Sequence, residues 1–139
     1  MSQSLRVMVI DDNQDAADSL ARLVRLWGHV VQVGYDESAV ALAQEHQPEV
    51  ILLDVGMPRV DGFTIARRLR ETIPASQAII IAVTGFHDEA TERRCYESGF
   101  NHFLVKPVDS ASLRALLDAR LRARANGSSA TAEMPANKK

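Results

Sequence analysis

The sequence contains little that would support a disulfide-linked, membrane-spanning or secreted protein. Its 139 residues include one cysteine, Cys95, which excludes an internal disulfide and a cysteine-based metal cluster within one copy. No run approaches the roughly 20 consecutive apolar residues of a membrane span. The start of the chain has no apolar signal-peptide core. We therefore expect a cytoplasmic protein without a membrane association.

An excess of charge of one sign is also missing. Lys and Arg number 16 against 18 Asp and Glu, which gives a formal net charge of -2. Such a balance offers no whole-molecule attraction to nucleic acid or to an anionic membrane. A hydrophobic content of 46% is ordinary for a globular protein, and the length suits one domain. The composition predicts a single globular domain that does not bind nucleic acid.

Four short apolar runs each end in a polar side chain. They are residues 7–10 before Asp11 and Asp12, residues 50–53 before Asp54, residues 79–83 before Thr84, and residues 103–105 before Lys106. Such runs suit strands covered on both faces, and ligands bind beyond the carboxyl ends of strands in an open parallel sheet. If the strands lie side by side, three mutually repelling carboxylates converge with a hydroxyl and an ammonium. A hard divalent cation and a phosphoryl group would together use every member of this cluster.

Segments with a helical spacing of apolar residues separate these runs. Helices are expected at residues 13–27, 37–46, 63–71, 88–98 and 109–124, and one more strand at residues 30–33. Gly28 is expected to end the first helix in a left-handed turn, Gly99 to end the fourth, and Asp36 to cap the second. The fivefold alternation predicts an α/β fold, a doubly wound five-stranded parallel sheet with helices on both faces. Residues 126–139 lack apolar periodicity and are expected to be a disordered tail after a domain of residues 1–125.

Together these motifs resemble the receiver domain of bacterial two-component response regulators, over residues from about 5 to 124. The matching elements are Asp11-Asp12, Asp54, Met57-Pro58, Asp61-Gly62, Thr84 and Lys106-Pro107, in this order. The resemblance implies a flavodoxin-like sheet with the strand order 2-1-3-4-5. It also implies a signalling switch that accepts a phosphoryl group and is not an enzyme.

The resemblance implies a role for each site residue. Asp54 would accept the phosphoryl group from the phosphohistidine of a histidine kinase or a histidine phosphotransfer protein. Thr84 and Lys106 would contact that group and stabilise its charge. The implied ligands of Mg²⁺ are Asp11, Asp12, Asp54 and the backbone carbonyl of Gly56.

The resemblance also implies how the switch would work. The Lys106-Pro107 bond would be cis, and Thr84 and Phe103 would form the conformational switch. A downstream protein would then dock on the face formed by residues 88–124, with the chain a monomer or a phosphorylation-dependent dimer. Gly56, which has no side chain to orient water, and Phe86, whose ring could cover the site, suggest slow self-dephosphorylation.

Several of these residues also fit ordinary structural roles. Asp11-Asp12 or Asn13 could cap the helix that follows, Thr84 could be a turn residue, and Lys106 a solvated side chain. We expect Cys95 to be a small buried residue. Surface positions are expected for His29, His46, His87 and His102, and solvated positions for Arg67, Arg68, Arg70 and the arginines of the last helix.

Alternative functions remain to be distinguished. The Met1 start and the short tail favour a free-standing single-domain regulator, whereas a receiver module of a hybrid histidine kinase is the alternative. A haloacid dehalogenase-type phosphatase would need a DxDx motif, which Asp11-Asp12-Asn13-Gln14 does not supply. A flavin-binding electron carrier would need amide and hydroxyl donors where residues 11–15 are acidic.

Overall fold

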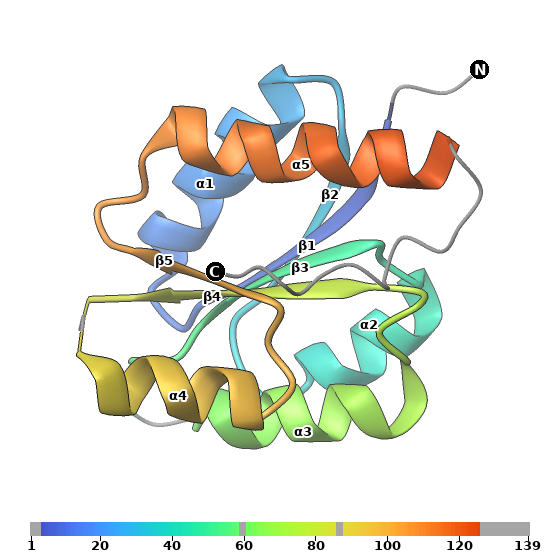
Figure 1. Cartoon of the computed structure of the whole chain (residues 1–139). Helices are drawn as coiled ribbons and strands as arrows, with labels where there is room; N and C mark the ends of the chain where they lie inside the picture. The colour runs from blue at the N-terminus through green and yellow to red at the C-terminus, as the bar shows by residue number, and fades with distance from the viewer. Residues whose placement is uncertain (1–3, 59–60, 86–87, 126–139) are drawn as a thin grey trace.

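A computed structural model of the chain describes residues 4–58, 61–85 and 88–125. It contains one parallel sheet with the strand order β2-β1-β3-β4-β5, and a helix follows each strand (Figure 1). The predicted fold class is confirmed.

The expectations for Phe86, for His87 and for a tail at 126–139 lie outside the described residues. The elements are β1 (Arg6–Ile10), α1 (Gln14–Leu26), β2 (Val30–Gly34), α2 (Ala39–His46), β3 (Val50–Asp54), α3 (Gly62–Thr72), β4 (Ile79–Thr84), α4 (Glu89–Glu97), β5 (His102–Val105) and α5 (Ser110–Ala125).

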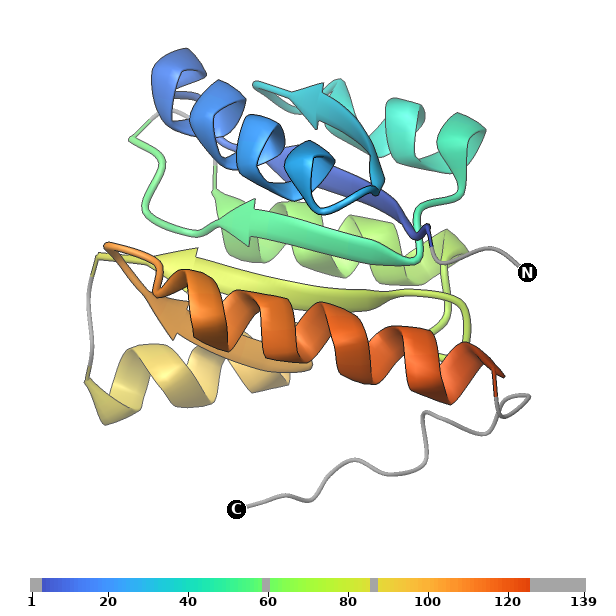
Figure 2. The ribbon, with the colours of Figure 1, turned by 90° about the horizontal axis from the view of Figure 1, so that it is seen from above.

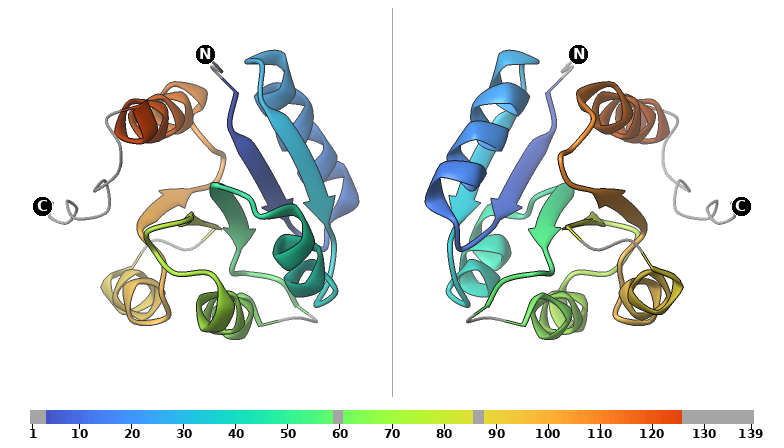
Figure 3. Two further views of the ribbon diagram at one scale, coloured as in Figure 1. Left: turned by 90° about the vertical axis from the view of Figure 1, so that its right-hand side faces the viewer. Right: turned by 90° about the vertical axis from the view of Figure 1, so that its left-hand side faces the viewer.

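The helices form a layer on each face of the sheet. Figure 3 shows α1 and α5 on one side and α2, α3 and α4 on the other. Each layer encloses its own cluster of buried apolar side chains, because alternate residues of the strands point to opposite faces. The central strand β3 is buried along its whole length, as its apolar run predicts. Because all the strand pairs are parallel, the carboxyl ends of the five strands lie at one edge of the sheet.

Three ends of two helices, α1 and α4, follow from local capping chemistry and backbone conformation. The side-chain oxygen Oδ1 of Asn13 accepts a hydrogen bond from the N–H of Ala16 at 3.0 Å, so Asn13 caps α1 and leaves the preceding acidic pair for other contacts. Gly28 has a φ angle of +98°, in the left-handed region predicted for the end of α1, and Gly99, predicted to end α4, has a φ angle of +107°. Local sequence is sufficient to place these boundaries.

The predicted cap at Asp36 is wrong. α2 begins at Ala39, and its N-cap residue, Ser38, makes no side-chain capping bond. The carboxylate of Asp36 instead accepts from the N–H of Ser38, at 2.9 Å, and from its hydroxyl. An Asp side chain that bonds the backbone two residues ahead forms a turn, and this turn replaces the expected first residues of the helix.

The predicted surface position of His29 is also wrong. His29 is 7% exposed, and its Nδ1 accepts a hydrogen bond from the backbone N–H of Leu5 at 3.0 Å. The imidazole thus provides an acceptor for a buried backbone donor at the start of β1.

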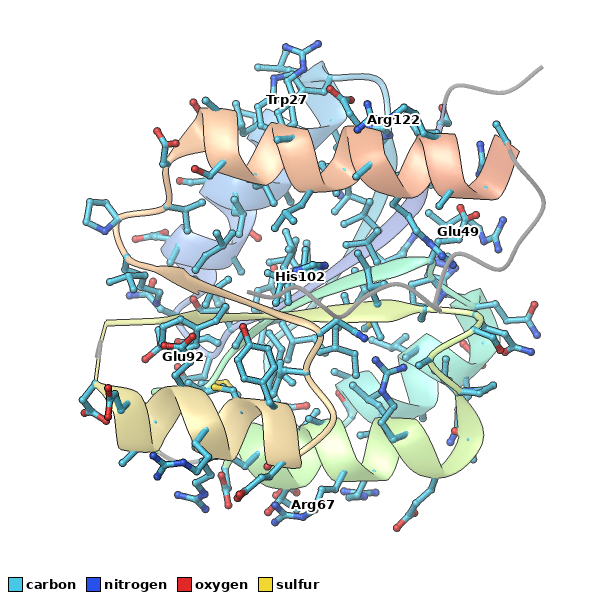
Figure 4. The ribbon with its side chains drawn as sticks, viewed as in Figure 1. Trp27, Glu49, Arg67, Glu92, His102 and Arg122 are labelled. Atoms are coloured by element: carbon cyan, nitrogen blue, oxygen red, sulfur yellow. The ribbon has the colours of Figure 1, made fainter. Side chains whose placement is uncertain are left out.

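Three arginines that we expected in solvent, Arg70, Arg120 and Arg124, are tied to the fold instead, and Arg120 donates to the carbonyl oxygen of Gln77 at 2.9 Å. Arg70 donates to the carbonyl oxygens of Gly99, at 3.0 Å, and Ala78, at 2.8 Å, and burial lowers the pKa of its guanidinium to about 10. Arg124, in the last turn of α5, donates to both carboxylate oxygens of the buried Glu49, at 3.0 and 2.9 Å. Figure 4 shows Glu49 beneath the end of α5. Each guanidinium satisfies oxygen acceptors that burial would otherwise leave unpaired.

Cys95 is a small buried residue, as predicted. It is 0% exposed, on the side of α4 that faces the sheet, and burial raises the pKa of its thiol to about 11. A thiol with such a pKa is almost entirely protonated at neutral pH, so it is a poor nucleophile.

Candidate functional site

Three carboxylates meet where β1 and β3 end. The two strands are neighbours, with Ile10 paired to Leu53, so Asp11 and Asp12 after one strand lie beside Asp54 at the end of the other. One oxygen of each carboxylate lies within 4.8 Å of the others. Asp11 and Asp54 are buried and Asp12 is half-buried. The sequence analysis placed these three residues together, and the structure brings them together.

Lys106 lies across the carboxylates from β5. Its Nζ is 3.2 Å from Oδ2 of Asp54 and 3.4 Å from Oδ2 of Asp11. The Lys106 N–H donates to the carbonyl of Thr84 at 2.7 Å, which fixes the backbone of the lysine beside the end of β4. The Lys106-Pro107 peptide bond is cis. One ammonium therefore contacts two carboxylates that come from different strands.

The backbone around Asp54 is closely packed. The N–H of Gly56 donates to Oδ1 of Asp54 at 2.9 Å, which leaves Oδ2 toward Lys106. Gly62, the first residue of α3, lies against the same segment: a Cβ there would be 2.7 Å from the Asp54 carbonyl oxygen and 2.7 Å from Cα of Val55. Such distances are too short for a side chain, so α3 can begin this close to Asp54 only with glycine.

The site has an unfavourable concentration of negative charge. Burial raises the pKa of Asp54, and the carboxylate of Asp11 raises it further. The N–H of Gly56 and the ammonium of Lys106 lower it, but the pKa remains above its usual value. Burial lowers the pKa of Lys106, but the two carboxylates raise it more, so the lysine is charged. One ammonium does not fully relieve the repulsion, and an additional cation would be stabilising here.

The donor atoms suit a hard metal ion. The cluster consists of carboxylate oxygens, and the backbone of Gly56 runs directly beside Asp54. Mg²⁺ and Ca²⁺ prefer oxygen ligands, and Mg²⁺ is commonly held by a few carboxylates together with water and phosphoryl oxygens. The acidic cluster is typical of a magnesium site.

Thr84 lies on β4, the strand next to β3 and Asp54, and Phe103 lies on β5, one strand further out. Thr84 is the fully buried last residue of β4, one position beyond Val83, which pairs with Asp54. Phe103 is half-buried on β5 and packs against the core cluster on the α2, α3 and α4 side of the sheet. Both positions agree with the places that the sequence analysis gave them along the strands.

An apolar cleft opens beside the carboxylates, which the sequence analysis did not identify. Its volume is about 560 Å³, and it lies between α1 and the segment that joins β5 to α5. In the view of Figure 2, β3 and β4 are seen between α1, in blue, and α5, in orange. The helical spacing of leucines on α1 was an available signal, but the sequence analysis used it only to predict the helix. The lining residues include Leu20, Leu23, Leu52, Val83, Pro107 and Val108, with Asp11, Asp54 and Lys106 also contributing.

Among the described residues, no helix is both long enough and apolar enough to cross a membrane.

Comparison with known families gives a match over most of the chain. The family described as "Response regulator receiver domain" matches residues 7–118. An uncharacterized 14.6 kDa protein of Leptolyngbya boryana is 33% identical over 112 residues, which cover 80% of this chain and 86% of that protein. The transcriptional regulatory protein PrrA of Mycobacterium tuberculosis is 36% identical over 129 residues, which cover 92% of this chain and 54% of PrrA. The chain therefore spans most of the first relative but about half of the second.

Solved structures show the same fold. A CheY-like receiver domain protein from Methanospirillum hungatei has a TM-score of 0.79 at 18% identity, covering 89% of this chain and 98% of the other. A response regulator from Burkholderia pseudomallei has a TM-score of 0.75 at 27% identity, covering 88% of this chain and 72% of the other. That second structure contains a phosphorylated aspartic acid, a calcium ion and citrate.

Proposed function

The chain belongs to the response regulator receiver domain family, whose members are phosphoacceptor switches of two-component signalling, and we propose that Asp54 is its phosphoacceptor. The observation that supports this most strongly is the position of Asp54. It ends the central strand, 3.2 Å from the Lys106 ammonium and within 4.8 Å of two further carboxylates. The solved relative with a phosphorylated aspartic acid and a calcium ion supports the same assignment.

The chemistry would be transfer of a phosphoryl group from a phosphohistidine to Asp54. The Gly56 N–H occupies Oδ1, so Oδ2 is the oxygen that attacks phosphorus, in line with the departing imidazole nitrogen. A bond forms between Oδ2 and phosphorus while the bond from phosphorus to nitrogen breaks. The products are an acyl phosphate on Asp54 and a neutral histidine on the donor, because the other ring nitrogen of the phosphohistidine carries a proton when the P–N bond breaks. Because such transfers depend mainly on position and charge stabilisation, fixed partners around Oδ2 matter more than an added base.

Mg²⁺ would be held by Asp11, Asp12, Asp54 and the carbonyl of Gly56. When bound, it supplies positive charge beside the transferred oxygens and relieves the repulsion among the carboxylates. Lys106 would exchange its contact with Asp54 for one with the phosphoryl group, since its side chain is 37% exposed and can move. Thr84 would donate its hydroxyl from the end of β4.

The donor would be a histidine kinase or a histidine phosphotransfer protein. The apolar cleft beside Asp54 supports docking of a protein, because its wall of leucine, valine and proline offers a surface that water solvates poorly. A cytoplasmic location follows from such a partner. Whether the chain acts as a free-standing regulator or as the receiver module of a hybrid histidine kinase depends on that partner.

The output would be a change in protein binding. We assign the switch to Thr84 and Phe103, with the face formed by residues 88–124 as the surface for a downstream protein or for a second copy. The absence of a side chain at Gly56 would make self-dephosphorylation slow, because nothing at that position orients a water molecule. The family match leaves the phosphatase and flavin-carrier alternatives without support.

Incubation of the chain with a small acyl phosphate and Mg²⁺ tests this function. The intact mass should increase by one phosphoryl group, and a chelator should prevent the increase. Steady release of phosphate from a phosphomonoester, without a stable mass increase, would contradict the proposal in favour of a phosphatase.

A further inference from the structure

α4 is held to the fold by little apolar packing. Of its nine residues, all within the described part of the chain, Cys95 alone is buried. A segment with few buried apolar contacts costs little free energy to displace. The arrangement of α4 therefore depends on the few long side chains that link it to other elements.

One of these side chains joins α4 to the start of α3. The guanidinium of Arg94 lies over the ring of Phe63, with Cζ 4.0 Å from the ring centroid. The same guanidinium is 3.8 Å from Oδ2 of Asp61. Phe63 is fixed in turn by an edge-on contact with Phe100, at 6.3 Å between centroids. We call the contact of Arg94 with Asp61 and Phe63 the arginine clamp.

The arginine clamp holds the two residues that flank Gly62. Asp61 is the N-cap of α3 and accepts from the N–H of Phe63 at 3.0 Å, so these residues form one rigid turn. Gly62, between them, lies against the backbone of Asp54 with no room for a Cβ. A displacement of the Asp54 backbone therefore has a direct mechanical path to Arg94 and α4.

We propose that the arginine clamp couples the arrangement of α4 to the occupancy of Asp54. It stabilises α4 in the unphosphorylated arrangement, and a phosphoryl group at Asp54 displaces the first turn of α3 and weakens the contact. This proposal rests on the proposed function, but its path differs from that of Thr84 and Phe103. Because such coupling is reciprocal, release of the clamp must increase the affinity of the site for a phosphoryl group.

The test compares Arg94→Gln with Arg93→Gln, which removes the same charge from the neighbouring exposed position on α4. Beryllofluoride with Mg²⁺ mimics the phosphoryl group. In Arg94→Gln without beryllofluoride, amide resonances of residues 88–97 should move part of the way toward their positions in the beryllofluoride-bound wild type. Its affinity for beryllofluoride should rise by about three- to tenfold, from loss of an exposed ion pair and a cation–π contact. Arg93→Gln should match the wild type in both measurements.

A second variant separates the clamp from general damage to the helix. Asp61→Asn retains an N-cap acceptor and removes the charge that faces Arg94, so it should shift the α4 resonances in the same direction. Equal behaviour of Arg94→Gln and Arg93→Gln, with normal binding of beryllofluoride, would overturn the clamp and leave the proposed function intact. Failure of the wild type to bind beryllofluoride would contradict the proposed function and, with it, the coupling.

Discussion

The ionised carboxylate of Asp54 destabilises the folded state, and a bound cation can offset this destabilisation. Its pKa is raised above the usual value, first by burial, so the folded state binds the proton of Asp54 more tightly than the unfolded chain does. The stability associated with this group is therefore complete at low pH and is lost as the pH rises through the raised pKa. At neutral pH the ionised carboxylate of Asp54 therefore destabilises the fold.

Millimolar Mg²⁺ should raise the thermal unfolding midpoint of the unphosphorylated chain, because the ion binds only the folded arrangement of carboxylates. An ion concentration of about ten times the dissociation constant adds about 1.4 kcal/mol, or a few degrees for a domain of this size. Asp12→Ala should reduce the increase, whereas Asp15→Ala, at an exposed position on α1, should leave it unchanged. Equal midpoints for the native chain in chelator and in Mg²⁺ would show that the acidic cluster is not a metal site.

His29 should make the stability of the fold depend on pH. Burial lowers its pKa and the charge of Asp118 only partly opposes this, so the unfolded chain takes up a proton near pH 6.5 before the folded chain does. Stability should therefore fall as the pH decreases through about 6.5. A protonated imidazole would also lose the Nδ1 acceptor that bonds the Leu5 N–H.

His29→Asn retains an acceptor and does not titrate. Urea unfolding at pH 7 and pH 5 should show a smaller loss of stability in this variant than in the wild type. His46→Asn, on α2, controls for the loss of a histidine. A wild-type pH dependence that His29→Asn leaves unchanged would mean that other groups cause it.

Individual site residues were predictable where their position along a strand determined their neighbours. Asp11 and Asp54 follow apolar runs directly, and the parallel pairing of β1 with β3 brings the two carboxylates side by side. His29 and Arg124 were not predictable in this way, because their partners, Leu5 and Glu49, lie 24 and 75 residues away in the sequence. From the sequence alone, such a polar side chain is predicted to be solvated, because the buried group that it hydrogen-bonds is known only from the fold.

The end of α5 is fixed to the opposite edge of the sheet from the acidic site. Arg124 donates to Glu49 and to the carbonyl of Ser4, and Glu49 also accepts from the N–H of Arg6 at 3.0 Å. Burial acts to raise the pKa of Glu49, but these hydrogen bonds and charges lower it overall. A lowered carboxyl pKa gives stability that is present above the unfolded value and is lost as the pH falls through the folded one.

Arg124→Gln should destabilise the fold by about 1–2 kcal/mol at pH 7, because Glu49 keeps its charge but loses the guanidinium nitrogen that donates to both its oxygens in a partly exposed site. Arg122→Gln, at an exposed position two residues earlier (Figure 4), should change stability by less than about 0.5 kcal/mol. The difference should decrease as the pH falls through the lowered pKa of Glu49 and its carboxylate is protonated. If both variants unfold at the same urea concentration at pH 7, the ion pair does not hold α5.

Helices and strands were predictable to the extent that local sequence determines them. The apolar spacing placed all five helices, and Asn13, Gly28 and Gly99 set ends through local bonds or φ angles. α2 began later than predicted, because the turn at Asp36 competes with a cap over the same few residues. The weak anchoring of α4 was not apparent, since it depends on which of its side chains the fold buries.

The architecture explains why one edge of the sheet carries the chemistry. Alternation of strands and helices is enough to predict a parallel sheet with two covered faces, and hence the convergence of strand ends. It does not determine the strand order, which came from the family resemblance and which the structure confirms. The distribution of apolar packing, and with it the cleft beside α1, becomes visible only in three dimensions.

Transmission from the site to the face formed by residues 88–124 should depend on Phe103. The ring is half-buried, so an inward movement can bury more of it without a hydrogen-bond partner. Phe103→Ala should leave phosphorylation of Asp54 nearly unchanged and weaken the phosphorylation dependence of partner binding or dimerisation. Chemical-shift mapping with and without beryllofluoride measures this response. If the wild-type resonances of residues 88–124 do not move, apart from Lys106 and its neighbours, coupling from Thr84 to Phe103 is wrong.

The most direct test of the central claim is the intact mass of the wild type and of Asp54→Asn after incubation with a small acyl phosphate and Mg²⁺. Asn is close to isosteric with Asp and removes the nucleophilic oxygen and its charge, so the variant should fold normally. The wild type should gain one phosphoryl group, and Asp54→Asn should gain none. A phosphoryl group on Asp54→Asn would move the acceptor to Asp11, Asp12 or Thr84, and an unmodified wild type would contradict the assignment of the site as a phosphoacceptor.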